Sequence, residues 1–182
     1  MFTAEERYPI ELNDVFTLSD RTPIRVRALH RFEDGPVQEL FDHLSLRTRY
    51  LRFLSPLSSL PDSLMRLLTG VDYRRSVALL ALHDISDRQE VVALGSFGAV
   101  DDECVEVALV VRDDWQRRRI GTELALRVLD AAEKRGFHFF VANFYSHNRP
   151  VRQLLARVGK VVSATVSGGV SELVFVRRSG SP

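Results

Sequence analysis

Residues 104–122, CVEVALVVRDDWQRRRIGT, decide the fold that we expect for this chain. The strand that we place at 103–111 is apolar on both faces apart from Glu103 at its start and Glu106, which is typical of a strand in the middle of a sheet. A polar turn and three consecutive arginines follow, and helical spacing of apolar residues begins near Arg119. The stretch therefore predicts a central strand, a short turn and the N-terminus of a helix.

The predicted turn has the features of an anion site. The first backbone N–H groups of a helix have no partner within the helix, and the helix dipole adds partial positive charge there. Such a junction favours a pyrophosphate. Gly121 would let a phosphate approach the backbone, and Arg117, Arg118 and Arg119 would add charge-assisted contacts. The alternative interpretation of the arginine triplet is a solvated helix start.

Segments of period two and period 3.6 alternate around this stretch and predict one α/β domain. We expect strands at 23–30, 77–85, 91–100, 103–111, 139–144, 161–166 and 172–177, and helices at 36–44, 61–68, 119–135 and 149–158. This order predicts a single mixed central sheet with helices on both faces, a three-layer α/β/α domain at 23–178. Residues 1–22 are expected to form a loosely packed leader, and residues 179–182 a flexible C-terminus.

Composition argues against several classes of protein. The 182 residues are 45% hydrophobic and 27% charged, which is typical of a globular domain and not of a disordered chain. A net charge of +1 offers no general attraction to nucleic acid or to an anionic membrane. The apolar runs are too short to span a bilayer, and we expect no secretion signal near the start, because Glu5, Glu6 and Arg7 leave no room for its apolar stretch. One cysteine, Cys104, favours a reducing cytoplasmic location.

The turn also carries a resemblance to a known family. Residues 116–121 resemble the acyl-CoA-binding motif of the GNAT N-acetyltransferase superfamily, Gln/Arg-x-x-Gly-x-Gly/Ala. Gln116 fills the first position and Gly121 the last, whereas Arg119 stands in place of the middle glycine. This replacement predicts a tighter or slightly displaced phosphate turn, or a helix that starts one residue earlier.

Two further motifs occur in the order expected for that superfamily. Asn148, at the start of a helix that ends before Gly159, resembles the second cofactor motif, although capping of the helix is the alternative role of this asparagine. Upstream, residues 50–53 (Tyr-Leu-Arg-Phe) resemble the Tyr-x-Arg-Phe segment of bacterial protein-lysine acetyltransferases of the Pat type. The Pat-type transferase domain is therefore the nearest resemblance, and it suggests a protein lysine as acceptor.

The resemblance implies transfer of an acetyl group from acetyl-CoA to a primary amine, either a protein lysine or a small molecule, by direct attack without an acyl-enzyme. It implies that the cofactor lies between two splayed central strands, and that many relatives are dimers. No metal is expected, since His138 and His147 lack ligand spacing. The implied cofactor-binding residues are Leu109, Val110, Val111, Gln116, Arg117, Arg118, Arg119, Ile120, Gly121, Thr122 and Asn148.

Glu106 is the candidate catalytic residue, as a general base. A carboxylate in an apolar strand costs several kcal/mol unless it is paired, protonated or faces a cleft. Desolvation would increase its basicity and suit it to proton abstraction. Its position also matches the strand glutamate of Pat-type enzymes. A structural salt bridge with an arginine is the alternative.

The general acid is not identified by the sequence. Leu155 occupies the position where many superfamily members have tyrosine, so Tyr145 is the nearest replacement, and water is another. Tyr50 is expected to line the acceptor cleft, and Cys104 is interpreted as a small buried side chain and not as a nucleophile. The competing functions are a non-catalytic acyl-CoA-binding module and a nucleic-acid-binding protein, of which the near-zero net charge disfavours the second.

Overall fold

The computed structural model describes residues 7–178. In chain order its elements are β1 (Asp14–Thr17), β2 (Pro23–Ala28), α1 (Asp34–Asp42), α2 (Leu46–Phe53), α3 (Asp62–Thr69), β3 (Ser76–Ile85), β4 (Arg88–Ala99), β5 (Cys104–Val111), α4 (Ile120–Glu133), β6 (Phe139–Tyr145), α5 (Arg149–Val158), β7 (Gly159–Ser167) and β8 (Val170–Arg177). Short 3-10 helices occur at Ile10–Leu12 and Asp113–Trp115. Within these residues, no helix combines the length and apolar character needed to cross a membrane.

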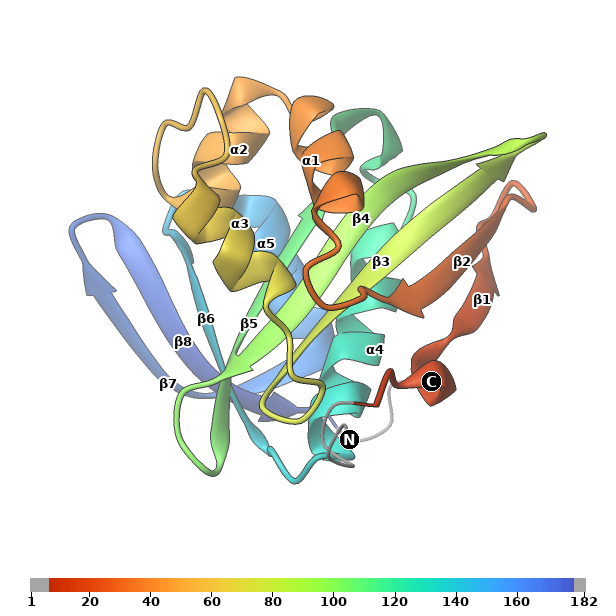
Figure 1. The fold of residues 1–182 in the computed structure, drawn as a ribbon. Coiled ribbons are helices and arrows are strands. Elements are labelled where there is room, and N and C mark those ends of the chain that lie inside the picture. The colour runs from red at the N-terminus through yellow and green to blue at the C-terminus, as the bar shows by residue number, and fades with distance from the viewer. Residues whose placement is uncertain (1–6, 179–182) are drawn as a thin grey trace.

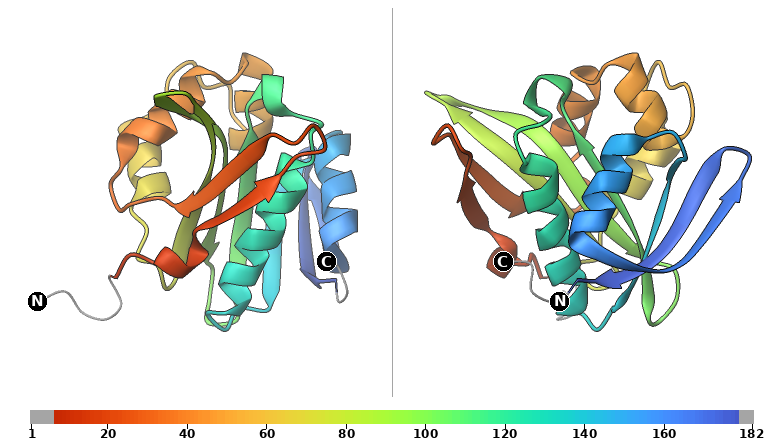
Figure 2. Two further views of the ribbon diagram at one scale, coloured as in Figure 1. Left: turned by 90° about the vertical axis from the view of Figure 1, so that its right-hand side faces the viewer. Right: turned by 180° about the vertical axis from the view of Figure 1, so that it is seen from behind.

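The described residues form one eight-stranded sheet in the order β1-β2-β3-β4-β5-β6-β8-β7. Neighbouring strands are antiparallel except for β5 and β6, which are parallel because α4 connects them. Helices α1, α2 and α3 cover one face of the sheet (Figure 1). Figure 2 shows α4 and α5 on the opposite face. The predicted three-layer α/β/α architecture is confirmed.

The core consists of two hydrophobic clusters, one on each side of the sheet. Strand β3 contributes to both, since Val77 and Leu79 point toward α4 while Ala78 and Leu80 point toward α1 and α3. This alternation follows from the period of two along a strand, and burial of both faces makes β3 apolar throughout. The two layers of helices are therefore anchored to a rigid sheet, on which the functional residues are placed.

The expected loose leader is wrong for its described part. Residues Asp14–Thr17 form β1, which pairs with β2. Ahead of β1, the Tyr8 hydroxyl donates to the carbonyl of Ala28 at 3.1 Å, and the Tyr8 ring stacks on His30. The segment showed no period because β1 is a short edge strand in which only Phe16 is buried. Residues 1–6 and 179–182, and thus the predicted flexible C-terminus, lie outside the described residues.

Helix α2 was not predicted as a helix. It buries none of its residues fully, so it lacks the apolar stripe by which an amphipathic helix is recognised. Its start is fixed by Ser45, whose side chain accepts a hydrogen bond from the Thr48 N–H, and it ends at Leu54, which adopts a left-handed conformation at φ 53°. The other predicted elements agree with the structure to within three residues at each end.

Candidate active site

The central feature of the site is a gap between β5 and β6. These strands pair only from Cys104–Phe139 to Glu106–Val141, although β5 continues to Val111. Beyond Glu106 the two strands diverge within the sheet, toward the end of the sheet that lies near α2 (Figure 1). Glu106 therefore lies at the point where the sheet opens.

A cavity of about 360 Å³ occupies this gap. On one face it is lined by the end of α2 and the following loop, including Arg52 and Leu54. On the other face it is lined by α4 and α5, including Val128 and Leu155. Because residues from both helical layers line it, the cavity crosses the sheet. Most of its described lining is hydrophobic, and the polar or charged side chains are Arg52, Ser55, Glu106 and Asn143.

Backbone groups of β5 face this gap without a strand partner. Arg112 N–H donates to Val92 at one end of the β4–β5 pair, and Val100 N–H donates to Cys104 at the other. Residues of even number in β5 therefore bond to β4, and those of odd number point their N–H and C=O groups toward β6. Within the described residues, Leu109 lies wholly beyond the β5–β6 pairing and keeps both groups available, whereas at Val107, next to the Glu106–Val141 pair, only the carbonyl is open.

Val110 and Val111 were also predicted to contact the cofactor through the backbone, but their environments differ from that of Leu109. The carbonyl of Val111 accepts a hydrogen bond from Gln116 Nε2 at 3.0 Å, which holds the turn after the strand. Val110 pairs with Leu94 of β4, and its side chain is buried in the core on the α1–α3 side. The structure therefore does not bring Val110 to the cavity.

The turn before α4 has an unusual backbone. Arg117 and Arg119 adopt left-handed conformations with φ of 61° and 71°. The helix starts at Ile120, so the alternative of an earlier start is wrong. Arg119 instead adopts the conformation that the motif glycine would take without a Cβ penalty. The first helical bond of α4 runs from Glu123 N–H to Arg119, which leaves the N–H groups of residues 120–122 without intrahelical partners.

The three arginines of this turn have different environments. Arg118 forms an ion pair with Asp20 in the β1–β2 turn and stacks over the Trp115 ring at 4.3 Å. Hydrogen bonds from Thr22 and the Arg118 guanidinium lower the pKa of Asp20 to about 2. Arg118 is therefore engaged in holding the fold, contrary to its predicted phosphate contact. The Arg117 and Arg119 side chains are exposed and make no ion pair within residues 7–178.

The remaining predicted cofactor residues are placed as follows. The Ile120 side chain is buried in the core, so Ile120 can face a ligand only through its backbone. The Thr122 side chain is half-buried. A Cβ added at Gly121 would lie in ordinary van der Waals contact with Leu109 Cδ2 at 3.4 Å, so packing of α4 against β5 does not itself require a glycine at this position. Asn148 is buried and its side chain accepts from Val151 N–H at 3.4 Å, which is the capping role.

Glu106 is exposed at the mouth of the gap and is not desolvated, because β6 diverges beside it. Its carboxylate accepts a hydrogen bond from Asn143 Nδ2 at 3.3 Å. In the described part of the chain it forms no ion pair, so the expected alternative of a salt bridge is wrong. The sequence analysis did not identify Asn143, although this residue interrupts an apolar strand just as Glu106 does.

Arg52 was noted only as part of a motif, and the structure places it in the cavity lining. Its Nε is shielded from solvent and has no hydrogen-bond partner. Burial lowers the pKa of Arg52 to about 10, an effect that the nearby Glu106 carboxylate opposes. A buried polar atom without a partner was not foreseeable from the local sequence.

Neither tyrosine has a clear acid function in the structure. The Tyr145 hydroxyl donates to the carbonyl of Leu54 at 3.1 Å, and the Tyr145 ring stacks on Tyr50 at 4.6 Å. Hydrogen bonding with Tyr50 raises the pKa of Tyr145, which makes it a weaker acid. Leu155 lines the cavity and is apolar. The general acid thus stays unassigned.

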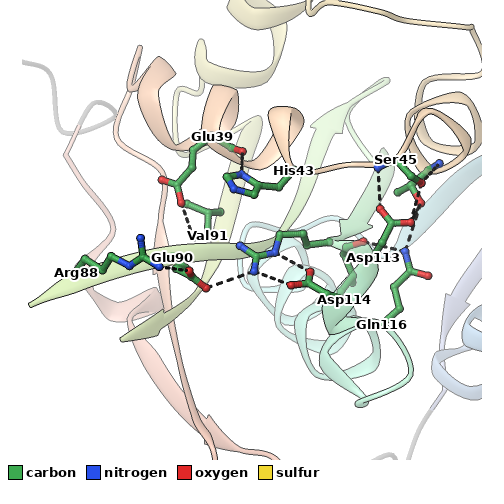
Figure 3. A network of polar contacts seen from close by, with 12 residues as sticks. Glu39, His43, Ser45, Arg88, Glu90, Val91, Asp113, Asp114 and Gln116 are labelled. Carbon is green, nitrogen blue, oxygen red and sulfur yellow. Dashed lines mark hydrogen bonds and ion pairs between the residues drawn. The ribbon is translucent and has the colours of Figure 1, made fainter. Parts of the chain in front are cut away.

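Asp113 connects the turn before α4 to α2. Its carboxylate accepts hydrogen bonds from Ser45 N–H at 2.9 Å, Ser45 Oγ at 2.7 Å and Thr48 Oγ1 at 2.7 Å. Figure 3 shows Ser45, Asp113 and Gln116 converging at this position. Burial alone would raise the pKa of Asp113, but these hydrogen bonds outweigh it and lower the pKa. The helix that carries Arg52 is therefore tied to the turn that precedes α4.

A gap in a parallel strand pair, bordered by open backbone groups and ending at a helix N-terminus, defines a site for a long ligand with an anionic end. The chain belongs to the acetyltransferase (GNAT) family, whose model matches residues 40–159. It is therefore an N-acetyltransferase, and enzymes of this family use acetyl-CoA and act on amine acceptors. Residues 7–178 hold no group of three or more side chains suited to bind a metal ion.

Individual relatives agree with this assignment. The chain is 26% identical over 148 residues to acetyltransferase PA5475 of Pseudomonas aeruginosa, covering 81% of this chain and 80% of that protein. The GNAT domain of S. lividans PAT superposes with a TM-score of 0.82 at 22% identity, covering 93% of this chain and 99% of that one. YncA, a putative acetyltransferase from Salmonella typhimurium solved with its cofactor acetyl-CoA, has a TM-score of 0.63 at 18% identity, covering 87% and 95%.

Proposed function

We propose that this chain transfers the acetyl group of acetyl-CoA to a primary amine, with Glu106 as the general base. The observation that carries the proposal is the position of Glu106. Its carboxylate is free of ion pairs within the described residues and lies where β5 and β6 diverge, in a cavity that opens to both helical layers. A base at this point can reach an acceptor on one side and a donor on the other.

The residues of the gap fit the donor. The carbonyl of Val107 and both backbone groups of Leu109 are open and of the kind that pair with the amides of a pantetheine arm. The N–H groups of residues 120–122 and the exposed guanidinium group of Arg117 suit a pyrophosphate, to which Arg119 contributes through the backbone conformation of the turn. Acetyl-CoA supplies an activated acetyl thioester there. Gln116 contributes by holding the turn through Val111.

The proton must leave the acceptor before its nitrogen can react. An alkylamine with an ordinary pKa near 10.4 is almost wholly protonated at neutral pH, so a base is needed. Glu106 takes this proton directly or through one water molecule, and its exposure gives the amine access. Asn143 donates to Glu106 and thereby orients the carboxylate.

The acceptor is proposed to be a primary amine of a protein lysine or of a small molecule. The motif at residues 50–53 supports the lysine, because α2, which carries it, borders the cavity near Glu106. The unpaired Cys104 supports a cytoplasmic location. We also propose that the chain forms a homodimer.

The test is the variant Glu106→Gln, which keeps the side-chain volume and removes the basic oxygen. We expect kcat for acetyl transfer to fall by about 100-fold or more at neutral pH, with acetyl-CoA affinity nearly unchanged. The deficit should shrink as pH rises, because free amine then accumulates. Glu103→Gln is the matched control, since Glu103 is an exposed carboxylate in the β4–β5 turn and does not line the cavity.

Two results would overturn the proposal. Wild-type protein must gain thermal stability from acetyl-CoA, by about 2.7 kcal/mol at 100 times its Kd, and the absence of any shift at millimolar acetyl-CoA would contradict donor binding. A folded Glu106→Gln protein with full activity at neutral pH would remove Glu106 from the mechanism.

A further inference from the structure

Arg52 is the charged side chain of the cavity that the proposed reaction does not use. It sits near the C-terminus of α2, and its neighbours in the described lining on this face are largely apolar: Leu51, Phe53, Leu54, Leu57 and Leu64. Across residues 7–178, no hydrogen bond or ion pair satisfies its guanidinium, which lies over the Phe53 ring at 5.0 Å. Its Nε is closed to solvent and unpartnered, as is that of Arg49, so the two arginines differ in their terminal nitrogens.

Arg49, in the same helix, has a structural role and serves as a comparison. Arg49 lies one turn earlier and donates from its terminal nitrogens to the carbonyl of Ser58 at 2.8 Å and to that of Asp42 at 3.4 Å. It also lies over the Phe41 ring at 4.1 Å. Arg49 thus ties α2 to two neighbouring segments, whereas Arg52 ties nothing within the described chain.

An unpaired charge that is partly buried, as Arg52 is, destabilises the folded state, because it gives up part of its hydration without gaining a partner. The lowered pKa of Arg52 reflects the same cost. Glu106 is the charged group that offsets it, yet Glu106 is exposed and hydrogen bonded to Asn143. No described residue supplies a suitable partner for the guanidinium, and the group that would satisfy it is an anion.

We propose that Arg52 binds a carboxylate carried by one of the two substrates, away from the atoms that react. This inference rests on the proposed function of the same cavity. A planar guanidinium matches a carboxylate through two parallel hydrogen bonds, and the apolar surroundings strengthen that contact. Together, Arg52 and Glu106 present one positive and one negative group, which complements a substrate with an amine and a carboxylate.

The carboxylate has two sources in this cavity. One is the acceptor, as an amine with a carboxylate close to the amino group, like that of an α-amino acid. The other is the donor, as the far end of a dicarboxylic acyl chain, which would extend through the gap toward α2. In both cases Arg52 determines specificity and takes no part in bond making.

The experiment compares matched substrates that differ in charge. For the acceptor, acetyl-CoA is used with α-amino acids and with their amides. For the donor, succinyl-CoA is compared with butyryl-CoA on one neutral alkylamine. Each comparison is made for wild type, Arg52→Gln and the control Arg49→Gln, by kcat/KM and also by the ligand-induced shift in melting temperature without turnover.

We expect wild type to prefer the carboxylate-bearing member of one pair by about 10- to 100-fold, the size of a charged hydrogen bond. Arg52→Gln should abolish this preference and change kcat/KM for the neutral member by less than about threefold, whereas Arg49→Gln should keep the preference. Arg52→Gln should also melt no lower than wild type, because it removes an unpaired charge. Arg52→Met, which fits an apolar cavity, is the second variant if the first does not fold.

Two outcomes would overturn the inference. Wild type could show no preference in either pair, by rate or by melting shift. Alternatively, Arg52→Gln could lower both members of each pair equally and change the pH–rate profile, which would make Arg52 a positioning residue for Glu106. Failure of the proposed function looks different, since no amine would then be acetylated, and the melting shifts would still decide whether Arg52 recognises a carboxylate.

Discussion

Replacing Arg119 by glycine tests the reading of the turn before α4. Arg119 has φ of 71°, a left-handed conformation that costs an L-residue about 1–2 kcal/mol. Glycine escapes this strain but loses about 0.5–1 kcal/mol through its greater freedom in the unfolded chain. The net gain is roughly 0.5–1 kcal/mol, which for a chain of this length raises the melting temperature by about 1–4 °C.

Arg21→Gly is the matched control. Arg21 is also an exposed arginine with a left-handed backbone, at φ 69°, and it lies in the β1–β2 turn away from the cavity lining. Both variants should gain similar stability in calorimetry. Since Arg119→Gly keeps the N–H groups of residues 120–122, its affinity for acetyl-CoA by titration should be equal to or better than that of wild type.

Either of two results would show that the Arg119 side chain matters more than its backbone conformation. A lower melting temperature for Arg119→Gly, with a gain for Arg21→Gly, would show that the Arg119 side chain stabilises the turn by more than the backbone strain costs. A loss of tenfold or more in acetyl-CoA affinity would show that the Arg119 guanidinium itself binds phosphate, beyond what the backbone contributes.

Asp113→Ala removes three hydrogen bonds from Ser45 and Thr48, so we expect the free energy of unfolding to fall by about 1–3 kcal/mol. Because α2 borders the acceptor face, the KM for the amine should rise more than the Kd for acetyl-CoA, and equal changes would contradict this. Asp20→Asn should lower the melting temperature at pH 7. Since the pKa of Asp20 is lowered from 3.8 to about 2, the stabilisation is present above pH 3.8 and is lost toward pH 2. Melting curves of both proteins should converge over that range, and a constant difference would exclude a contribution from the Asp20 charge.

Much of the fold followed from local sequence. Helix α5 was predicted with its observed bounds, because Asn148 and Pro150 mark its start and Gly159 its end. Strand β5 was predicted as central because both of its faces are apolar. Strand β1 and helix α2 were not predicted. Strand β1 pairs only along one edge, and α2 is held by Asp113, which lies more than 60 residues away in the chain.

The sequence identified candidate site residues by their chemical type, but it did not reveal the environment of their side chains. Glu106 stood out as a carboxylate in an apolar strand, but its exposure depends on how far β6 pairs with β5, which the pattern of either strand does not reveal. Arg118 and Arg119 are adjacent and look alike in sequence. In the structure Arg118 pairs with the distant Asp20 and stacks over Trp115, whereas Arg119 is exposed and has a left-handed backbone.

The brief pairing of β5 and β6 also gives the sheet a seam. Strands β1–β5 and strands β6, β8 and β7 each form an antiparallel ladder, while three residue pairs join the two halves edge to edge. A ligand arm that bonds to β5 in the gap would lie where a missing strand segment would be, and would lengthen that join. Amide hydrogen exchange along β5 should therefore slow at Leu109 when the donor binds, so that the substrate acts as a temporary part of the sheet.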